Sequence, residues 1–142
     1  MHARKDGTLE KRAAIDTLAT LLSSERASKE VIRHVLQERE DLQSTGIGEG
    51  VAIPHAALAE LEAQSAALLI VPDGVAFDAI DGGDVYLLFS VIGPKRATGE
   101  HLKTLARVSR LLRSKLFREQ LIGAPDGAAA YELIAAEERG RT

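Results

Sequence analysis

The sequence of 142 residues contains no cysteine. This absence excludes disulfides, thiolate catalysis and cysteine-ligated zinc or iron–sulfur centres. An oxidising compartment has left no mark on the composition, so we expect a cytoplasmic protein.

The sequence also lacks long apolar runs and an excess of positive charge. No apolar run approaches the roughly 20 residues of a membrane span, and the first residues, MHARKDGTLEKRAA, include no apolar signal segment. The 18 basic and 21 acidic residues give a net charge of −3, and the two Tyr and three Phe do not alternate with Lys and Arg. We therefore expect neither membrane insertion nor nucleic-acid binding.

Metal and hydrolase motifs are missing as well. His34, His55 and His101 have no local metal-ligand spacing, and the chain has neither HExxH nor Gly-x-Ser-x-Gly. We expect no metal site and no serine nucleophile.

The apolar periodicity predicts a single α/β domain over residues 1–142, with a small sheet covered by helices. Apolar runs that end at turn residues predict neighbouring strands over 66–71 and 85–92, and a short strand over 75–80. Helical spacing predicts helices over about 9–22, 28–40, 58–62, 98–114, 116–122 and 126–138.

Four structure breakers, Gly46, Gly48, Gly50 and Pro54, predict a loop after the 28–40 helix. Glycines let backbone N–H groups approach an anion, but the Gly-Lys-Ser/Thr ending of a Walker loop and the dinucleotide spacing are absent. Taken alone, the loop is better explained as a connection that needs unusual φ angles.

His55 directly follows Pro54 and makes a phosphoryl-binding loop the stronger hypothesis. A neutral imidazole has a ring nitrogen free for in-line attack on phosphorus. His101 lies in the first turn of the predicted 98–114 helix, where the helix dipole disfavours imidazolium and free N–H groups can hold an anion. Arg39 would grip a phosphoryl group if the loop folds back beside it.

Simpler interpretations stand beside these. A histidine in a loop is more often a hydrogen-bonded surface group, and we expect a structural role for His34 within its helix. A set of basic residues at helical spacing predicts a solvated helix face, with partner docking left open; these are Lys103, Arg107, Arg110, Arg113, Lys115 and Arg118.

Five collinear segments resemble a known family. They are Glu38-Arg39-Glu40, STGIGEGVAIPHA at 44–56, FDAIDG at 77–82, LLFSVIGP at 87–94 and EHLKTLARVSRLL at 100–112. Together they resemble the fructose/mannitol-type enzyme IIA domains of the sugar phosphotransferase system, especially their free-standing nitrogen-regulatory relative. The likeness runs from about Leu9 to the last predicted helix.

The resemblance implies a small mixed β-sheet flanked by helices, and a phosphoryl group that passes from an HPr-like carrier to His55. It also implies that Arg39 and His101 line the site, that Ser44 and Thr45 shape the loop by hydrogen bonds, and that Nε2 of His55 is the acceptor. Phosphohistidine already carries the transfer potential, so no cofactor is expected.

Two departures from the family pattern lead to further expectations. Ala56 stands where a glycine usually follows the histidine, which predicts a restricted backbone at this point. The first strand of the family should be missing or reduced to a few residues, leaving an exposed sheet edge or pairing by another chain.

The resulting hypothesis is a phosphotransferase component of the nitrogen-regulatory type. Because no transporter or enzyme IIB segment follows on this chain, we expect its phosphorylation state to signal to a regulatory target protein. Two alternatives remain: a sugar-specific enzyme IIA that phosphorylates a separate enzyme IIB, and a non-transferring interaction module with the same fold.

Overall fold

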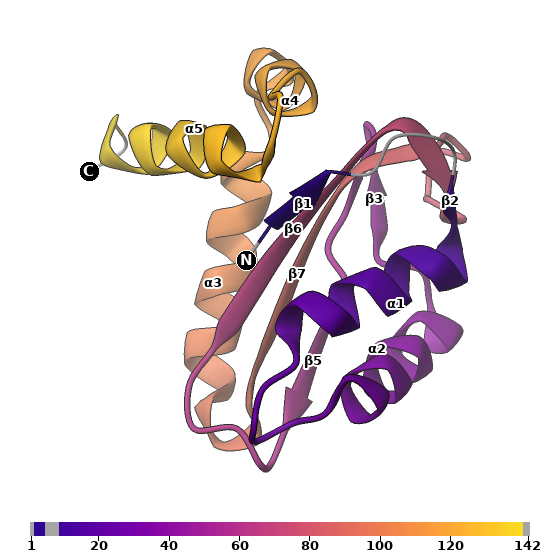
Figure 1. The fold of residues 1–142 in the computed structure, drawn as a ribbon, viewed down its shortest axis with the longest axis vertical. Coiled ribbons are helices and arrows are strands. Elements are labelled where there is room, and N and C mark those ends of the chain that lie inside the picture. Colours follow the sequence, from indigo (N-terminus) through magenta and orange to yellow (C-terminus); the bar gives the residue numbers. More distant parts are fainter. Residues whose placement is uncertain (1, 5–8, 141–142) are drawn as a thin grey trace.

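The structure, a computed structural model, describes residues 2–4 and 9–140. A mixed β-sheet forms the middle layer (Figure 1). Helices α1 (Lys11–Leu22) and α2 (Lys29–Leu42) cover one face, and α3 (Thr98–Leu111) lies on the other. Helices α4 (Lys115–Ile122) and α5 (Gly127–Gly140) follow at the C-terminal end of α3. The predicted fold class, a small mixed sheet flanked by helices, is confirmed.

Two long strands, β6 (Ser65–Ala76) and β7 (Val85–Pro94), form the centre of the sheet and pair antiparallel, as the two apolar runs predict. The other strands are short: β1 (His2–Arg4), β2 (Leu9–Glu10), β3 (Gly46–Gly48), β4 (Val51–Ala52) and β5 (His55–Leu58). Strands β1 and β2 run parallel to β6, β4 and β5 run parallel to β7, and β3 pairs antiparallel with β4.

Both faces of the central strands are apolar because helices cover both. On β6, Leu69 and Val71 face the core under α1 and α2, whereas Leu68 and Ile70 face the core that includes α3 and α4. This burial fixes the register of β7 and, through it, the position of β5.

The helix boundaries follow local signals. Ser28 caps α2 as predicted, since its Oγ accepts a hydrogen bond of 3.3 Å from the backbone N–H of Val31. Short helix η1 (Lys95–Ala97) leads into α3, whose first residues receive no side-chain cap from Ala97.

Among the described residues, no helix has the length and apolar character needed to cross a membrane.

Three predicted elements differ from the structure. Residues 58–62 form the end of β5 and a turn, not a helix. The predicted strand over 75–80 is wrong, because β6 continues through an irregularity between Ile70 and Val75 and ends at Ala76. The predicted loop contains β3 and β4, and His55 is the first residue of β5.

In the described residues, the first strand is β1, with three residues. Strand β1 pairs with β6 from Leu68 to Ile70 and forms one edge of the sheet. The Arg4 guanidinium donates to the carbonyl oxygens of Ile122 and Ala124, at 2.9 and 3.1 Å. This edge strand is therefore tied to the C-terminal end of α4.

Candidate functional site

The segment before His55 is a tight β3–β4 hairpin with a left-handed turn. Gly48, Glu49 and Gly50 have φ values of 95°, 57° and 80°. A Cβ on Gly50 would also lie 2.8 Å from the Tyr86 ring. The glycines predicted to shape this segment are therefore needed where the chain turns toward β4.

A buried carboxylate holds the start of the hairpin. Both oxygens of Glu40, which is 4% exposed, accept hydrogen bonds from the backbone N–H and Oγ1 of Thr45, at 2.8 to 3.1 Å. Lys11 Nζ lies 3.7 Å from the same carboxylate. Because a buried charge is tolerated when it is paired and hydrogen-bonded, this cluster fixes the hairpin to the end of α2.

Ser44 and Gly46 fix the other side of the hairpin. Ser44 Oγ donates to the carbonyl oxygen of Phe77 at 2.8 Å and accepts from the N–H of Gly46 at 3.1 Å. A Cβ on Gly46 would lie 2.9 Å from Cα of Ala79. Ser44 and Thr45 thus form hydrogen bonds that shape this segment.

Glu49 at the hairpin tip is held from two directions. Its N–H donates to Asp81 Oδ2 at 2.9 Å, and its carboxylate lies 3.0 Å from Nη2 of Arg118. The hydrogen bonds from Glu49 and Gly83 lower the pKa of Asp81. The predicted solvated role of Arg118 is wrong: this side chain is buried and also donates to two carbonyl oxygens at the end of α3.

Pro54 sets the direction of the chain into β5. Its carbonyl oxygen accepts from Oγ of the fully buried Ser90 at 2.8 Å and from the N–H of Val91 at 3.1 Å. His55, the first residue of β5, then pairs with Val91 of β7. The backbone that carries His55 is thereby attached to the central strand of the sheet.

The tautomer of His55 follows from one hydrogen bond. Nδ1 lies 2.7 Å from the carbonyl oxygen of Ile53. A carbonyl oxygen can only accept, so Nδ1 carries the proton and neutral His55 keeps its free lone pair on Nε2. Nε2 is therefore the ring nitrogen that keeps a free lone pair.

His101 lies in the first turn of α3, as predicted, and its ring centroid is 5.8 Å from that of His55. Burial lowers the pKa of His101 below its usual 6.5, and repulsion from protonated His55 adds to this. The main cause is thus burial, whereas the sequence pointed to the helix dipole.

Arg39, His55 and His101 line one open cavity of about 540 Å³ between α2, β5 and α3. Arg39 and His55 also line an adjoining cavity of about 250 Å³ with Ser44 and Thr45. The Arg39 Nη1 donates to the carbonyl oxygen of Gln43 at 2.8 Å, which keeps the guanidinium at the end of α2. A cation, a directed imidazole and a helix N-terminus are the parts that bind and transfer an anionic group.

Ala56, which stands where a glycine usually follows the histidine, lies in strand β5. Its backbone is extended and pairs with Ile92, and positive φ among non-glycine residues in the described segments is confined to Glu49 and Asp78. The side chain of Ala56 packs against the core beneath α2. The extended conformation at Ala56 is one that alanine adopts without strain, and the effect of the alanine on transfer stays a prediction.

Some positioning residues escaped the sequence analysis: Glu40, Asp81, Ser90 and Arg118. Asp81, Ser90 and Arg118 act on the hairpin or on β5 from distant segments, whereas Glu40 binds Thr45 only five residues away. The available signal was that Glu40, Asp81 and Ser90 lie in segments that carry the family resemblance. His34, by contrast, is exposed and 2.8 Å from Glu38, in keeping with its predicted place outside the site.

Comparison with known proteins gives this geometry a family. The model for "Phosphoenolpyruvate-dependent sugar phosphotransferase system, EIIA 2" matches residues 4–137. The chain belongs to this EIIA 2 family. It is 35% identical to a nitrogen regulatory protein of Pseudomonas aeruginosa, over 92% of this chain and 86% of the relative. As an EIIA 2 domain it is a phosphotransfer component.

Solved structures agree. The EIIA 2 domain superposes on nitrogen regulatory protein IIA-Ntr from Neisseria meningitidis with a TM-score of 0.85 and 34% identity, over 94% of this chain and 91% of that one. IIA mannitol from Escherichia coli shares the fold, with a TM-score of 0.74 and 19% identity over 92% of each chain. The predicted family is confirmed, with nitrogen-regulatory proteins among its similar relatives.

Proposed function

We propose that the protein is a phosphocarrier in which Nε2 of His55 accepts a phosphoryl group from a phospho-HPr-type protein. The observation that carries this proposal is the bond from His55 Nδ1 to the carbonyl oxygen of Ile53. It leaves a lone pair on Nε2, in a side chain that lines a cavity with Arg39 and His101.

The transfer needs positioning and charge stabilisation more than acid–base chemistry. The Nε2 lone pair forms the new N–P bond while the bond from phosphorus to the donor histidine breaks, and the electron pair of that bond returns to the donor nitrogen. Arg39 and His101, which line the same cavity as His55, stabilise the negative charge on the phosphoryl oxygens. No proton transfer to or from His55 is needed, since Nδ1–H stays bonded to Ile53.

The downstream partner is proposed to be a regulatory target protein. Identity to a nitrogen regulatory protein over most of both chains supports this role. The alternative is transfer to an enzyme IIB, supported by the solved complex of Escherichia coli enzyme IIA mannitol with phosphorylated enzyme IIB mannitol. A purified IIB cysteine domain that takes label from the phosphorylated protein would favour this alternative.

Labelled phosphoenolpyruvate, enzyme I and HPr test the proposal. Wild-type protein should become labelled only when enzyme I and HPr are both present. His55→Ala should not become labelled under the same conditions. His34→Ala is the matched control because His34 is exposed and paired with Glu38, and it should label like wild type. An unlabelled wild type would favour the non-transferring interaction module, and equal label on His55→Ala would overturn His55 as the acceptor.

A further inference from the structure

Gln64, in the turn that precedes β6, has an amide whose orientation is fixed by a neighbour. Its Nε2 donates to Glu100 Oε1 at 2.7 Å. A carboxylate oxygen can only accept, so this contact assigns the NH2 end of the amide to Glu100. The carbonyl oxygen Oε1 faces the other way and is buried without a hydrogen-bond donor among the described residues.

His101 supplies the matching buried atom. Its Nδ1 is the other buried side-chain nitrogen or oxygen without a partner in residues 2–4 and 9–140. Both side chains border Gly93: a Cβ there would lie 3.0 Å from Gln64 Cγ and 3.4 Å from His101 Nδ1. The glycine therefore leaves open the space that separates Gln64 from His101.

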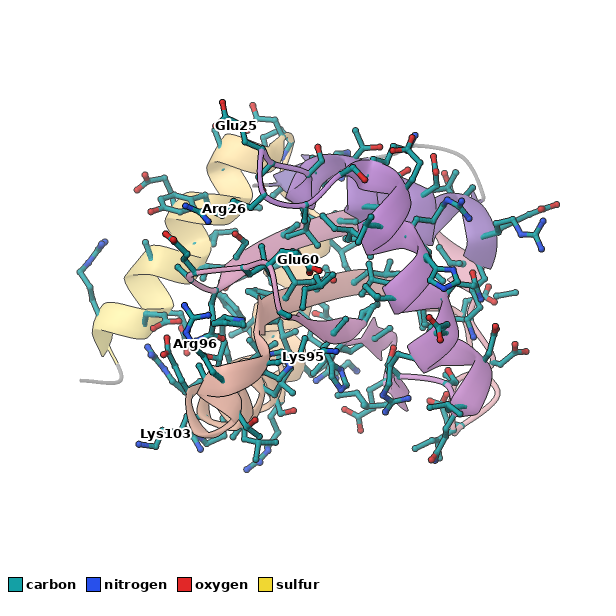
Figure 2. All side chains as sticks on the ribbon, turned by 90° about the horizontal axis from the view of Figure 1, so that it is seen from below. Glu25, Arg26, Glu60, Lys95, Arg96 and Lys103 are labelled. Atoms are coloured by element: carbon teal, nitrogen blue, oxygen red, sulfur yellow. The ribbon has the colours of Figure 1, made fainter. Side chains whose placement is uncertain are left out.

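The turn that carries Gln64 is held in place from the start of α3. The Arg96 guanidinium in η1 donates to the carbonyl oxygens of Leu61 and Glu62, at 3.1 and 3.3 Å. Figure 2 looks at the molecule from this end, with Arg96, Lys95 and Glu60 labelled. The hydrogen bonds of Arg96 therefore link the turn that carries Gln64 to the start of α3, which carries His101.

We propose that Gln64 is a positioning residue whose Oε1 accepts the Nδ1–H of His101 and so sets the tautomer of His101. An unpaired buried acceptor beside an unpaired buried ring nitrogen is costly, and this bond satisfies both. The part of the proposal that concerns a phosphoryl group rests on the proposed function of His55.

The assigned tautomer gives His101 two states. Neutral His101 with Nδ1–H has a lone pair on Nε2 and cannot donate to a phosphoryl oxygen from that atom. When His55 is phosphorylated, His101 takes up one proton from solvent at Nε2, so that Nε2–H donates to the phosphoryl group and Nδ1–H to Gln64.

The surrounding charges are consistent with the uptake of a proton by His101 when His55 is phosphorylated. Burial and His55 lower the pKa of His101 in the unphosphorylated protein, and a phosphoryl dianion opposes both effects. The other charged groups that line the cavity are Glu38, Arg39 and Asp41 on α2. Glu100, on the same turn as His101, is bonded to Gln64.

Long-range ¹H–¹⁵N spectra of the unphosphorylated protein test the assignment. At pH 8, wild type should show His101 with the proton on Nδ1, and Gln64→Leu should shift the population toward the Nε2–H tautomer. Gln120→Leu is the matched control, since Gln120 is exposed on α4, and it should resemble wild type. The Nε2–H tautomer in wild type, or the same tautomer in Gln64→Leu, would overturn the proposal.

Gln64→Glu gives a second readout if Gln64→Leu folds poorly. A carboxylate can accept from Nδ1–H and adds negative charge, so the pKa of His101 should rise above that of wild type. An unchanged His101 titration in Gln64→Glu would contradict the contact.

The phosphorylated state separates this proposal from the function of His55. Gln64→Leu should shift the phosphoryl equilibrium toward HPr by about tenfold, the value of one hydrogen bond to a charged group. If wild type takes no label but Gln64 sets the His101 tautomer, the proposed function fails and the Gln64–His101 contact stands. If wild type is labelled and the tautomer is insensitive to Gln64, only the contact fails.

Discussion

At the scale of single residues, the chemistry of the site depends on which nitrogen of His55 carries a proton. The carbonyl oxygen of Ile53 holds the proton on Nδ1 of His55. The backbone between Ile53 and His55 is held at Pro54, whose carbonyl oxygen accepts hydrogen bonds from Ser90 and Val91. The imidazole of His55, the proposed nucleophile, is thereby oriented before any partner binds, which would lower the entropic cost of transfer.

Arg39→Ala should slow phosphorylation of His55 by about tenfold to a hundredfold. A hydrogen bond to a charged group contributes about 1.5 to 3 kcal/mol, and the guanidinium is proposed to make such a bond to the phosphoryl group. Arg39 is partly exposed, so the free energy of unfolding should change by less than about 0.5 kcal/mol. Single-turnover transfer from phospho-HPr measures the rate; an unchanged rate would remove Arg39 from the site.

His101 should make the unphosphorylated protein less stable at acidic pH. Its pKa in the folded protein lies below 6.5, so the unfolded chain binds more protons as the pH falls. The stabilisation is present above about pH 6.5 and is lost as the pH falls through the folded-state pKa. Urea unfolding between pH 5 and 8 should show a smaller loss for His101→Gln than for wild type or His34→Gln. Equal slopes in all three proteins would contradict this.

At the scale of elements, the β3–β4 hairpin links the end of α2 to β5. Glu40 and Thr45 attach its start, and Asp81 and Arg118 hold Glu49 at its tip. The hairpin is short and left-handed at its turn, so its position depends on these contacts more than on its own pairing. Loosening them should affect both stability and the placement of His55.

Thr45→Val tests the buried part of this attachment. The substitution keeps the shape of the side chain but removes one donor to the Glu40 carboxylate, so it should lower the free energy of unfolding by about 1 to 3 kcal/mol. Thr20→Val is the matched control, because Thr20 is exposed on α1 and bonds only within its helix, and it should change stability by less than about 0.5 kcal/mol. Similar losses in the free energy of unfolding for Thr45→Val and Thr20→Val would contradict a stabilising role for the hydrogen bond from Thr45 to Glu40.

The same elements show what local sequence can predict. Helix α2 was predictable because Ser28, its cap, and its apolar stripe are adjacent in the chain. Strand β5 was not, since its short segment follows Pro54 and depends on pairing with β7, 36 residues away at the contact between Pro54 and Ser90. The helix predicted over 58–62 was wrong for a similar reason. An apolar spacing that suits one helical turn lies instead at the end of a strand.

At the scale of the whole molecule, the sheet brings together segments that are distant in sequence. Arg39 comes from α2, His55 from β5 and His101 from α3, and all three line one cavity. The residues themselves suggested phosphoryl chemistry at His55 with His101 and Arg39 nearby, and the family resemblance then implied that Arg39 and His101 line the site. The proposed contact between Gln64 and His101 was beyond either approach, because it depends on the absence of a side chain at Gly93.

The most direct test of the account is the identity of the phosphorylated atom. Protein phosphorylated by phosphoenolpyruvate, enzyme I and HPr should show, in long-range ¹H–¹⁵N spectra, a phosphoryl group on Nε2 of His55 while Nδ1 keeps its proton. A phosphoryl group on Nδ1 of His55, on another residue, or on none would contradict the account.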